Sequence, residues 1–514
     1  MPESPTQIRT VVLLKQLTAE LSSAYDQKPD DSASTGPPIV RPELAFAGLL
    51  ICSVAVWLFA IRAPFWLDET VSYWQIAGGF RQIWSRQEVM FPAYSYILWM
   101  TKLLFGASET ALRIPSLLAM LGAVYTLYLI AREFFSVTVS LIVAIVFSLH
   151  PSIIFAAIDA RPYAFALLAL NCAILFLVRW MHSHRQRDAI ACGITSALIF
   201  YFHYLFSVIL PAFALLLLLT ERRRLMLYKT HIVKALLVFT LVLMPVVPQF
   251  LRVFQTRHSH VFSTAPNLVG LVETFAPGAM LLFFLLAALF AAAFRQIDNS
   301  EYESPFTGIA SLLFAVIPLA ILYLVSSLTN THVFVDRYCL VAAPGIALCW
   351  GLLLSRIRSR SCQFVFCFVL LAWAAQVQFV APVHGHSWKP ALDVANKATS
   401  IDHAPVLICS DLVEADHGPI PTDIYSTWLY APLSYYHVQS QVVPLPRSLN
   451  AAAEAQVRNF LATATPAHRR FLLMGYYSGS STILSWVDAT TKSSYISNPL
   501  GTYDGVSVIE YTPR

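Results

Sequence analysis

Long apolar runs separated by short polar loops fill the chain from about residue 43 to residue 382. Runs of about 17 to 22 apolar residues match the hydrocarbon thickness of a bilayer, so we interpret each as a membrane span. A longer run, 190–220, exceeds one span and is divided here at the polar group Tyr201-Phe202-His203-Tyr204. The pattern then predicts about eleven transmembrane helices, near 43–61, 112–131, 137–157, 162–180, 190–203, 204–220, 231–251, 277–294, 307–328, 338–355 and 363–382.

The pattern changes in the tail, where polarity becomes ordinary. Short β-like runs at 406–409, 471–475 and 506–511 surround a helix-like stretch at 451–462, which predicts a small α/β domain. The predicted fold class is therefore an all-α polytopic membrane protein with a small C-terminal α/β domain. Three parts are expected: an N-terminal segment (1–42), a transmembrane domain (43–382) and the α/β domain (383–514).

Composition agrees with a membrane protein. Hydrophobic residues make up 57% of the chain and charged residues only 12%, against roughly 25% charged residues in soluble domains. The 8 cysteines show no CxxC spacing and lie mostly in apolar runs, so they favour neither a disulfide framework nor a metal site. Walker loops and the GxGxxG, HExxH and GxSxG motifs are absent from the sequence, so nucleotide-driven transport and common soluble hydrolase chemistry lose support.

Basic residues set the predicted orientation. They fall on alternate loops, which by the positive-inside rule are cytoplasmic: Arg132, Arg179/Arg185/Arg187, Arg222-Arg223-Arg224/Lys229, Arg295 and Arg356/Arg358/Arg360. The N-terminus is then cytoplasmic and the tail extracytoplasmic. The net charge of +5 is spread over these loops, so nucleic acid is not an expected partner.

Segment 62–111 falls on the outer side in this topology. Its short apolar run, 91–105, is interpreted as a helix along the membrane surface, because counting it as a span would reverse the basic loops. Trp66, Trp74, Trp84 and Trp99 suit the headgroup level.

Ionisable residues gather at the same outer face. Such groups are expensive to place beside a bilayer, so their convergence predicts a functional site. Transfer from a lipid-linked phosphate donor would use them: a carboxylate takes the proton of an attacking hydroxyl, and arginine, histidine or a divalent cation stabilises the leaving phosphate. The residues are Asp68, Glu69 and Glu88, then Asp159 and Arg161, then His203, and then His332, Asp336, Arg337 and Tyr338.

Six short motifs occur in an order that resembles the GT-C glycosyltransferases, and within them the bacterial protein-mannosyltransferase and aminoarabinose-transferase group. The likeness covers most of 43–382, and the tail resembles no family we can name. The motifs are Trp66-Leu67-Asp68-Glu69, Pro92-Ala93-Tyr94-Ser95-Tyr96, Glu109-Thr110-Ala111-Leu112-Arg113-Ile114-Pro115-Ser116, Ala160-Arg161-Pro162-Tyr163-Ala164, Tyr201-Phe202-His203-Tyr204 and Asp336-Arg337-Tyr338-Cys339-Leu340.

The resemblance implies a GT-C fold and an inverting transferase at the outer face of the bacterial inner membrane. Its donor would be a polyprenyl-phosphate sugar, and its acceptor a lipid, glycan or protein. The resemblance implies catalytic roles for Asp68, its partner Glu69, and Asp159. Arg161, Arg337, Tyr338 and His203 would bind the donor phosphate.

A divalent metal ion is left open. His203 resembles a histidine that helps to hold a metal in some relatives, and Glu88 lies one position from an acidic metal ligand. Where many relatives carry His-Pro-Pro or Lys-Pro-Pro in the first loop, this chain has Met90-Phe91-Pro92.

Simpler interpretations stay open beside these. Asp68 and Glu69 could be acids of a helix first turn, Asp159 and Arg161 a local ion pair, His203 a core histidine, and Arg337 a snorkelling side chain. Glu109 and Arg113 are predicted to be structural. The alternative functions are a transporter or flippase of lipid-linked sugars, and a relative that only binds a lipid-linked glycan.

Overall fold

The computed structural model divides the chain into two compact units. It describes residues 42–85, 92–220, 226–255, 265–275, parts of 280–289, 305–357, 359–380 and 386–514. The first unit comprises Met1–Phe59, Ser116–Phe250 and Ser263–Ala381, and the second Ala60–Pro115, Leu251–Phe262 and Pro382–Arg514. The outer loop, expected to belong with the transmembrane helices, is thus grouped with the C-terminal domain.

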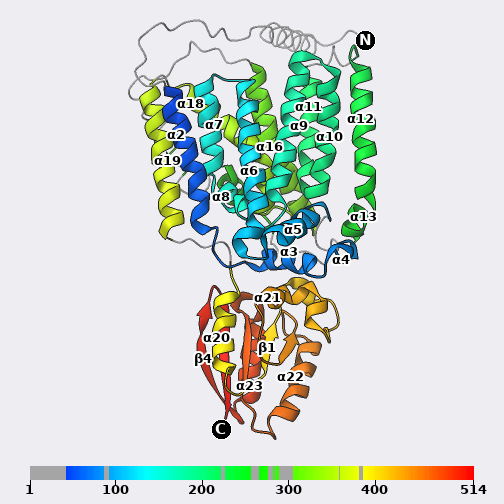
Figure 1. The fold of residues 1–514 in the computed structure, drawn as a ribbon, viewed down its shortest axis with the longest axis vertical. Coiled ribbons are helices and arrows are strands. Elements are labelled where there is room, and N and C mark those ends of the chain that lie inside the picture. The colour runs from blue at the N-terminus through cyan, green and yellow to red at the C-terminus, as the bar shows by residue number, and fades with distance from the viewer. Residues whose placement is uncertain are drawn as a thin grey trace, which may run out of the picture. The chain divides into compact units, whose positions relative to one another are not determined.

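Long apolar helices form the first unit (Figure 1). Among the described residues, seven helices are long and apolar enough to cross a membrane, or eight if the bent pair α7–α8 counts as one span. Two further expected spans correspond to the shorter α10 and η2–α11, and 277–294 lies largely outside the described residues. The helices that lie wholly or partly in this unit are α2 (Pro42–Ala55), η1 (Val56–Ala60), α6 (Glu109–Arg132), α7 (Val137–Leu149), α8 (Pro151–Ala157), α9 (Tyr163–Ser183), α10 (Gln186–Phe202), η2 (Tyr204–Ile209), α11 (Leu210–Thr220), α12 (Lys229–Leu243), η3 (Met244–Val246), α13 (Val247–Gln255), α14 (Leu268–Phe275), α16 (Pro305–Leu328), α17 (Asp336–Cys339), η5 (Leu340–Ala342), α18 (Ala343–Ser355) and α19 (Arg360–Val380).

Two breaks in these helices place polar residues. The expected single span 137–157 is instead a pair of helices bent by 73°, because Pro151 has no N–H to continue α7 and starts α8. The expected division of 190–220 is confirmed, since α10 ends at Phe202 and η2 begins at Tyr204. His203 stands between them in an extended conformation.

A glycine allows α18 to approach α16 closely. A Cβ added to Gly345 would lie 2.3 Å from the backbone nitrogen of Ala315 and 2.4 Å from the carbonyl carbon of Phe314. Backbone atoms in a packed helix cannot move aside as a side-chain tip can. We expect Gly345→Ala to lower stability by about 1–3 kcal/mol, measured by thermal unfolding of the purified protein. Gly308→Ala on α16 is the matched control, since nothing lies within 4 Å of its added Cβ.

Three short helices of the second unit correspond to the expected surface helices. They are α3 (Leu67–Ala77), α4 (Phe80–Ser85) and α5 (Pro92–Phe105). Among the described residues α5 has 14 residues, fewer than the about 20 that span a bilayer. Its interpretation as a helix along the membrane surface stays a prediction.

The C-terminal part of the second unit is an α/β domain with a five-stranded sheet of order β2-β1-β3-β5-β4. Strand β1 pairs in parallel with β2 and β3, and β5 pairs antiparallel with β3 and β4. The α/β domain expected from the sequence is thus confirmed. Its elements are α20 (Lys389–Thr399), β1 (Val406–Cys409), η6 (Val413–Asp416), η7 (Ile424–Ser426), η8 (Trp428–Tyr430), α21 (Ala431–Tyr435), β2 (Val442–Leu445), α22 (Ala451–Ala464), β3 (Phe471–Tyr476), α23 (Tyr477–Thr491), β4 (Tyr495–Tyr503) and β5 (Val506–Pro513).

Alternate residues of β1 enter two hydrophobic cores, one on each face of the sheet. Val406 and Ile408 pack with buried residues of α20 and α21, whereas Leu407 and Cys409 pack with buried residues of α22 and α23. This is the period of two that a strand imposes. A strand covered on both faces reads as a continuous apolar run, which is why Val406-Leu407-Ile408-Cys409 was recognisable in the sequence.

The α/β domain is joined to α3 and its flanking loops. Trp74 Nε1 donates a hydrogen bond to the Tyr425 carbonyl at 3.0 Å, and the Phe65 amide donates to the Tyr436 hydroxyl at 2.7 Å. Val71 and Trp74 also form a small apolar core with Ala431 of α21, which lies beside α3 in Figure 1. The C-terminal domain therefore fixes the helix that carries Asp68.

Candidate functional site

Two arginines and a histidine converge in the first unit. Arg161 lies in the loop between α8 and α9, His203 in the break between α10 and η2, and Arg337 on the one-turn helix α17. Both guanidinium groups interact electrostatically with the His203 ring. The structure thus brings together three residues that are far apart in the sequence, as expected for a site that binds an anion.

Aromatic rings surround this cationic cluster of Arg161, His203 and Arg337. The His203 ring lies 5.2 Å from the rings of both Tyr163 and Tyr338, measured between centroids. The Arg337 guanidinium lies 5.5 Å from the Tyr338 ring centroid. His203 Nδ1 is buried and has no hydrogen-bond partner among the described residues. The cluster therefore offers a hydrogen-bonding nitrogen beside two positive charges.

Asp159 lies two residues before Arg161 in the same loop. Its side chain is fully buried, and the Arg161 amide donates to the Asp159 carbonyl at 2.7 Å. The Ser116 hydroxyl of α6 donates to the Arg161 carbonyl at 3.2 Å. This tight turn fixes where both side chains begin. The predicted catalytic role of Asp159 remains a prediction.

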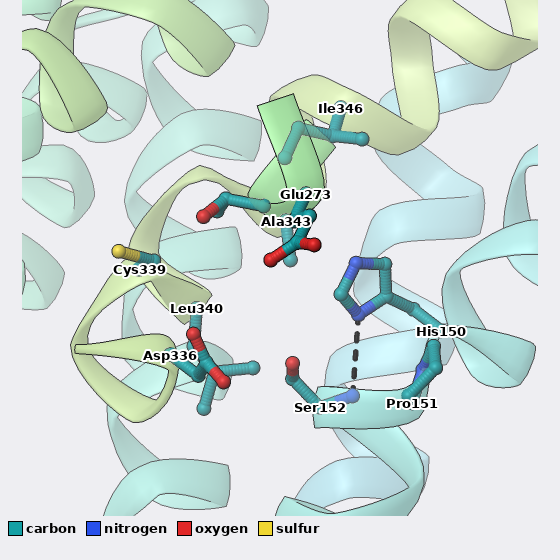
Figure 2. Close-up of a pocket in the computed structure, with 10 residues that line it drawn as sticks. His150, Pro151, Ser152, Glu273, Asp336, Cys339, Leu340, Ala343 and Ile346 are labelled. Atoms are coloured by element: carbon teal, nitrogen blue, oxygen red, sulfur yellow. Dashed lines mark hydrogen bonds between the residues drawn. The ribbon is translucent and has the colours of Figure 1, made fainter. Parts of the chain in front are cut away.

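A cavity of about 230 Å³ lies beside α17 in the first unit. Asp336 and Cys339 of α17 line it with His150 and Ser152 at the α7–α8 break and Glu273 of α14, as Figure 2 shows. The Ser152 amide donates to His150 Nδ1 at 3.3 Å. Sequence reasoning missed His150 and Glu273, and the only signal was the His-Pro pair inside an apolar run.

Asp68 and Glu69 stand in the first turn of α3, in the second unit, and have different surroundings. Asp68 is partly exposed, whereas the Glu69 carboxylate is completely buried. Glu69 accepts two hydrogen bonds from Arg113, of 2.8 Å from Nε and 2.6 Å from Nη2. Its Oε2 also accepts from the Trp66 amide at 3.3 Å, which caps the helix.

Arg113 ties this pair to the chain that leaves the first apolar helix. Its side chain is completely buried, and Nη1 donates to the carbonyls of Ile61 at 2.9 Å and Ala63 at 2.6 Å. The structural role expected for Arg113 fits these contacts. Arg113 engages both oxygens of Glu69, an arrangement that suits a residue holding α3 in place. The catalytic role expected for Glu69 stays a prediction.

The surroundings of His203 do not fit a divalent metal ion. Two guanidinium groups act on the His203 ring, and their positive charges disfavour a cation beside it. No group of three or more His, Cys, Asp or Glu that could hold a metal occurs among the described residues. Glu88, the other suggested ligand, lies outside them, so no step below is routed through a metal.

The predicted site residues thus fall into two groups. Arg161, His203, Arg337 and Tyr338 are together in the first unit, and Asp68 belongs to the second. A single cavity lined by both groups stays a prediction.

Comparisons with known proteins identify the fold. The family described as dolichyl-phosphate-mannose-protein mannosyltransferase matches residues 91–249. Two crystal structures of ArnT from Cupriavidus metallidurans, one bound to undecaprenyl phosphate and one in the apo state, superimpose with a TM-score of 0.54 at 11% identity. The match covers 91% of this chain and 97% of ArnT. The chain has a GT-C fold.

Other comparisons add little to this GT-C assignment. An apo oligosaccharyltransferase from Archaeoglobus fulgidus gives a TM-score of 0.44 at 13% identity, covering 88% of this chain and 69% of that one. No curated protein sequence matches the chain.

Proposed function

We propose that the protein is an integral-membrane glycosyltransferase that moves a sugar from a polyprenyl-phosphate carrier to a lipid, glycan or protein acceptor. The observation that carries the proposal is the cationic cluster of Arg161, His203 and Arg337. A phosphate ester beside apolar helices is the ligand that suits two guanidinium groups and a free imidazole nitrogen. The GT-C fold and the family match over 91–249 support the same reaction class.

Chemically, the reaction is a single displacement at the anomeric carbon. The acceptor oxygen forms a bond to this carbon as the bond to the phosphate oxygen breaks, so the configuration is inverted. Asp68 takes the proton from the acceptor hydroxyl. Arg161 and Arg337 stabilise the charge that develops on the leaving polyprenyl phosphate. The sugar, hexose or pentose, is left open.

The orientation of the basic loops supports a site at the outer face of a bacterial plasma membrane. In this topology the N-terminus is cytoplasmic and the α/β domain extracytoplasmic.

Incubating the purified protein in lipid nanodiscs with candidate polyprenyl-phosphate sugars and membrane extract tests the proposal. Mass spectrometry should detect free polyprenyl phosphate and an acceptor heavier by one sugar residue. Flipping of intact donor across proteoliposomes, without cleavage of the sugar–phosphate bond, would instead favour the transporter.

Removing one guanidinium from the cationic cluster should weaken donor binding. We expect Arg337→Gln to raise the KM for donor about 10- to 100-fold, because a hydrogen bond to a charged partner is lost. Initial rates at varied donor concentration measure the effect. Arg356→Gln is the matched control, because Arg356 is an exposed residue on a predicted cytoplasmic loop. An unchanged KM in Arg337→Gln would remove this residue from the donor site.

A further inference from the structure

The parallel strands of the α/β domain have a topological switch point between β1 and β3. From β1 the chain passes to β2 on one side, and from β3 through α23 it passes to β4 on the other side. Segments that leave the carboxyl ends of two neighbouring strands in opposite directions open a crevice, where ligands bind in open α/β sheets. This geometry directs attention to the residues that follow the three parallel strands.

Three polar side chains occupy this edge. Asp411 follows β1, Arg447 follows β2, and Tyr476 ends β3. Asp411 interacts electrostatically with Arg447 and His386, and with Tyr476. Arg447 Nε is buried and has no hydrogen-bond partner among the described residues. Together these four side chains, Asp411, Arg447, Tyr476 and His386, form what we name the edge cluster.

The edge cluster lies near Asp68. Burial, opposed by Arg447 and reinforced by the Asp68 carboxylate, raises the pKa of Asp411 to about 6. Such an effect requires the two acids to share one region. Trp66, two residues before Asp68, also forms a bridge with Ser387, the residue after His386.

Backbone contacts hold the edge cluster in place. The Ser410 hydroxyl, next to Asp411, donates to the Leu429 carbonyl at 2.7 Å. The Ser448 amide, next to Arg447, donates to Asp416 Oδ1 at 2.8 Å. Asp411 and Arg447 therefore extend from anchored loops, which favours a binding role over that of solvated surface residues.

The mixed charge of the edge cluster selects a class of ligand. A phosphate would meet the carboxylates of Asp68 and Asp411, and an amine would meet Arg447. A hydroxyl both donates and accepts hydrogen bonds, so it suits a carboxylate beside a guanidinium. We propose that the edge cluster is the acceptor subsite and binds the hydroxyl groups of an uncharged carbohydrate beside Asp68. The proposal rests on the transferase function given above.

Saturation-transfer NMR on the full-length protein in nanodiscs tests this proposal, with methyl glycosides as probes. We expect wild-type protein to saturate at least one glycoside, and Asp411→Asn and Arg447→Gln to weaken its binding about tenfold or more. Arg447→Lys keeps the positive charge but not the paired N–H groups of the guanidinium, so it should weaken glycoside binding by an intermediate amount. Asp393→Asn and Arg458→Gln are matched controls at exposed positions on α20 and α22.

The outcomes separate this proposal from the proposed function. Glycoside binding that depends on Asp411 and Arg447, even in protein that cleaves no donor, supports the subsite while the transferase assignment fails. If donor cleavage requires Asp68 but folded Asp411→Asn binds glycosides, or uses the acceptor, with an unchanged KM, the transferase assignment stands and the acceptor subsite is overturned. Preferential binding of methyl phosphate or of a serine-containing peptide at this edge would also overturn it. Thermal unfolding verifies that each variant is folded.

Discussion

Replacing Asp68 with asparagine should reduce sugar transfer by about 10²- to 10⁴-fold, the usual contribution of a general base. Asparagine has the same shape and still forms hydrogen bonds, but it cannot take a proton at neutral pH. Asp68 is partly exposed in the first turn of α3, where a negative charge favours the helix N-terminus. The loss of this charge should cost under about 1 kcal/mol of stability.

Single-turnover rates with saturating donor measure this effect directly. Donor affinity should be unchanged, because the cationic cluster that we assign to the phosphate is intact. Asp393→Asn, at an exposed position of α20, controls for the loss of one carboxylate from the same unit. A fully active, correctly folded Asp68→Asn variant would remove Asp68 from the reaction.

Adjacent acids illustrate what a sequence can and cannot resolve. The pair Asp68-Glu69 after an apolar run was enough to select this turn as a candidate site. Successive helical residues point about 100° apart, so one acid can be buried against Arg113 while its neighbour stays accessible. Which of the two acids is buried and which stays accessible depends on Arg113, 44 residues from Glu69. The local sequence pattern does not contain that information.

The sheet shows the same limit. The three strands expected from the sequence, β1, β3 and β5, are the central ones, and the two that were missed, β2 and β4, are at the edges. Edge strands tolerate proline, and Pro444 and Pro499 interrupt the apolar pattern there. Asp411 and Arg447 were missed for a related reason. Charged residues are ordinary in a domain of this polarity, and only the fold brings these two together near Asp68.

The buried pair between Glu69 and Arg113 should be one of the most sensitive points for stability. Changing Arg113 to methionine leaves the Glu69 carboxylate without its cationic partner in a site where both side chains are 0% exposed. It also removes the donor for the carbonyls of Ile61 and Ala63. Breaking a buried ion pair by removing one partner costs about 3–5 kcal/mol. We therefore expect Arg113→Met to unfold at a much lower temperature than the wild type.

A double-mutant cycle isolates the charge effect. Combining Glu69→Met with Arg113→Met removes both buried charges, so the double variant should be more stable than Arg113→Met alone. Glu454 and Arg458 on α22 provide the exposed reference pair, at 41% and 63% exposure, and Arg458→Met should cost under about 1 kcal/mol.

Measuring activity distinguishes a role in positioning α3 from a purely structural role. Arg113→Lys keeps the buried charge but loses the two-pronged hold on Glu69, so α3 should shift enough to slow transfer without loss of donor affinity. Wild-type stability in Arg113→Met, or an additive cycle, would show that the pair does not hold α3. Wild-type turnover in Arg113→Lys would show that the ion pair between Glu69 and Arg113 does not determine the position of Asp68.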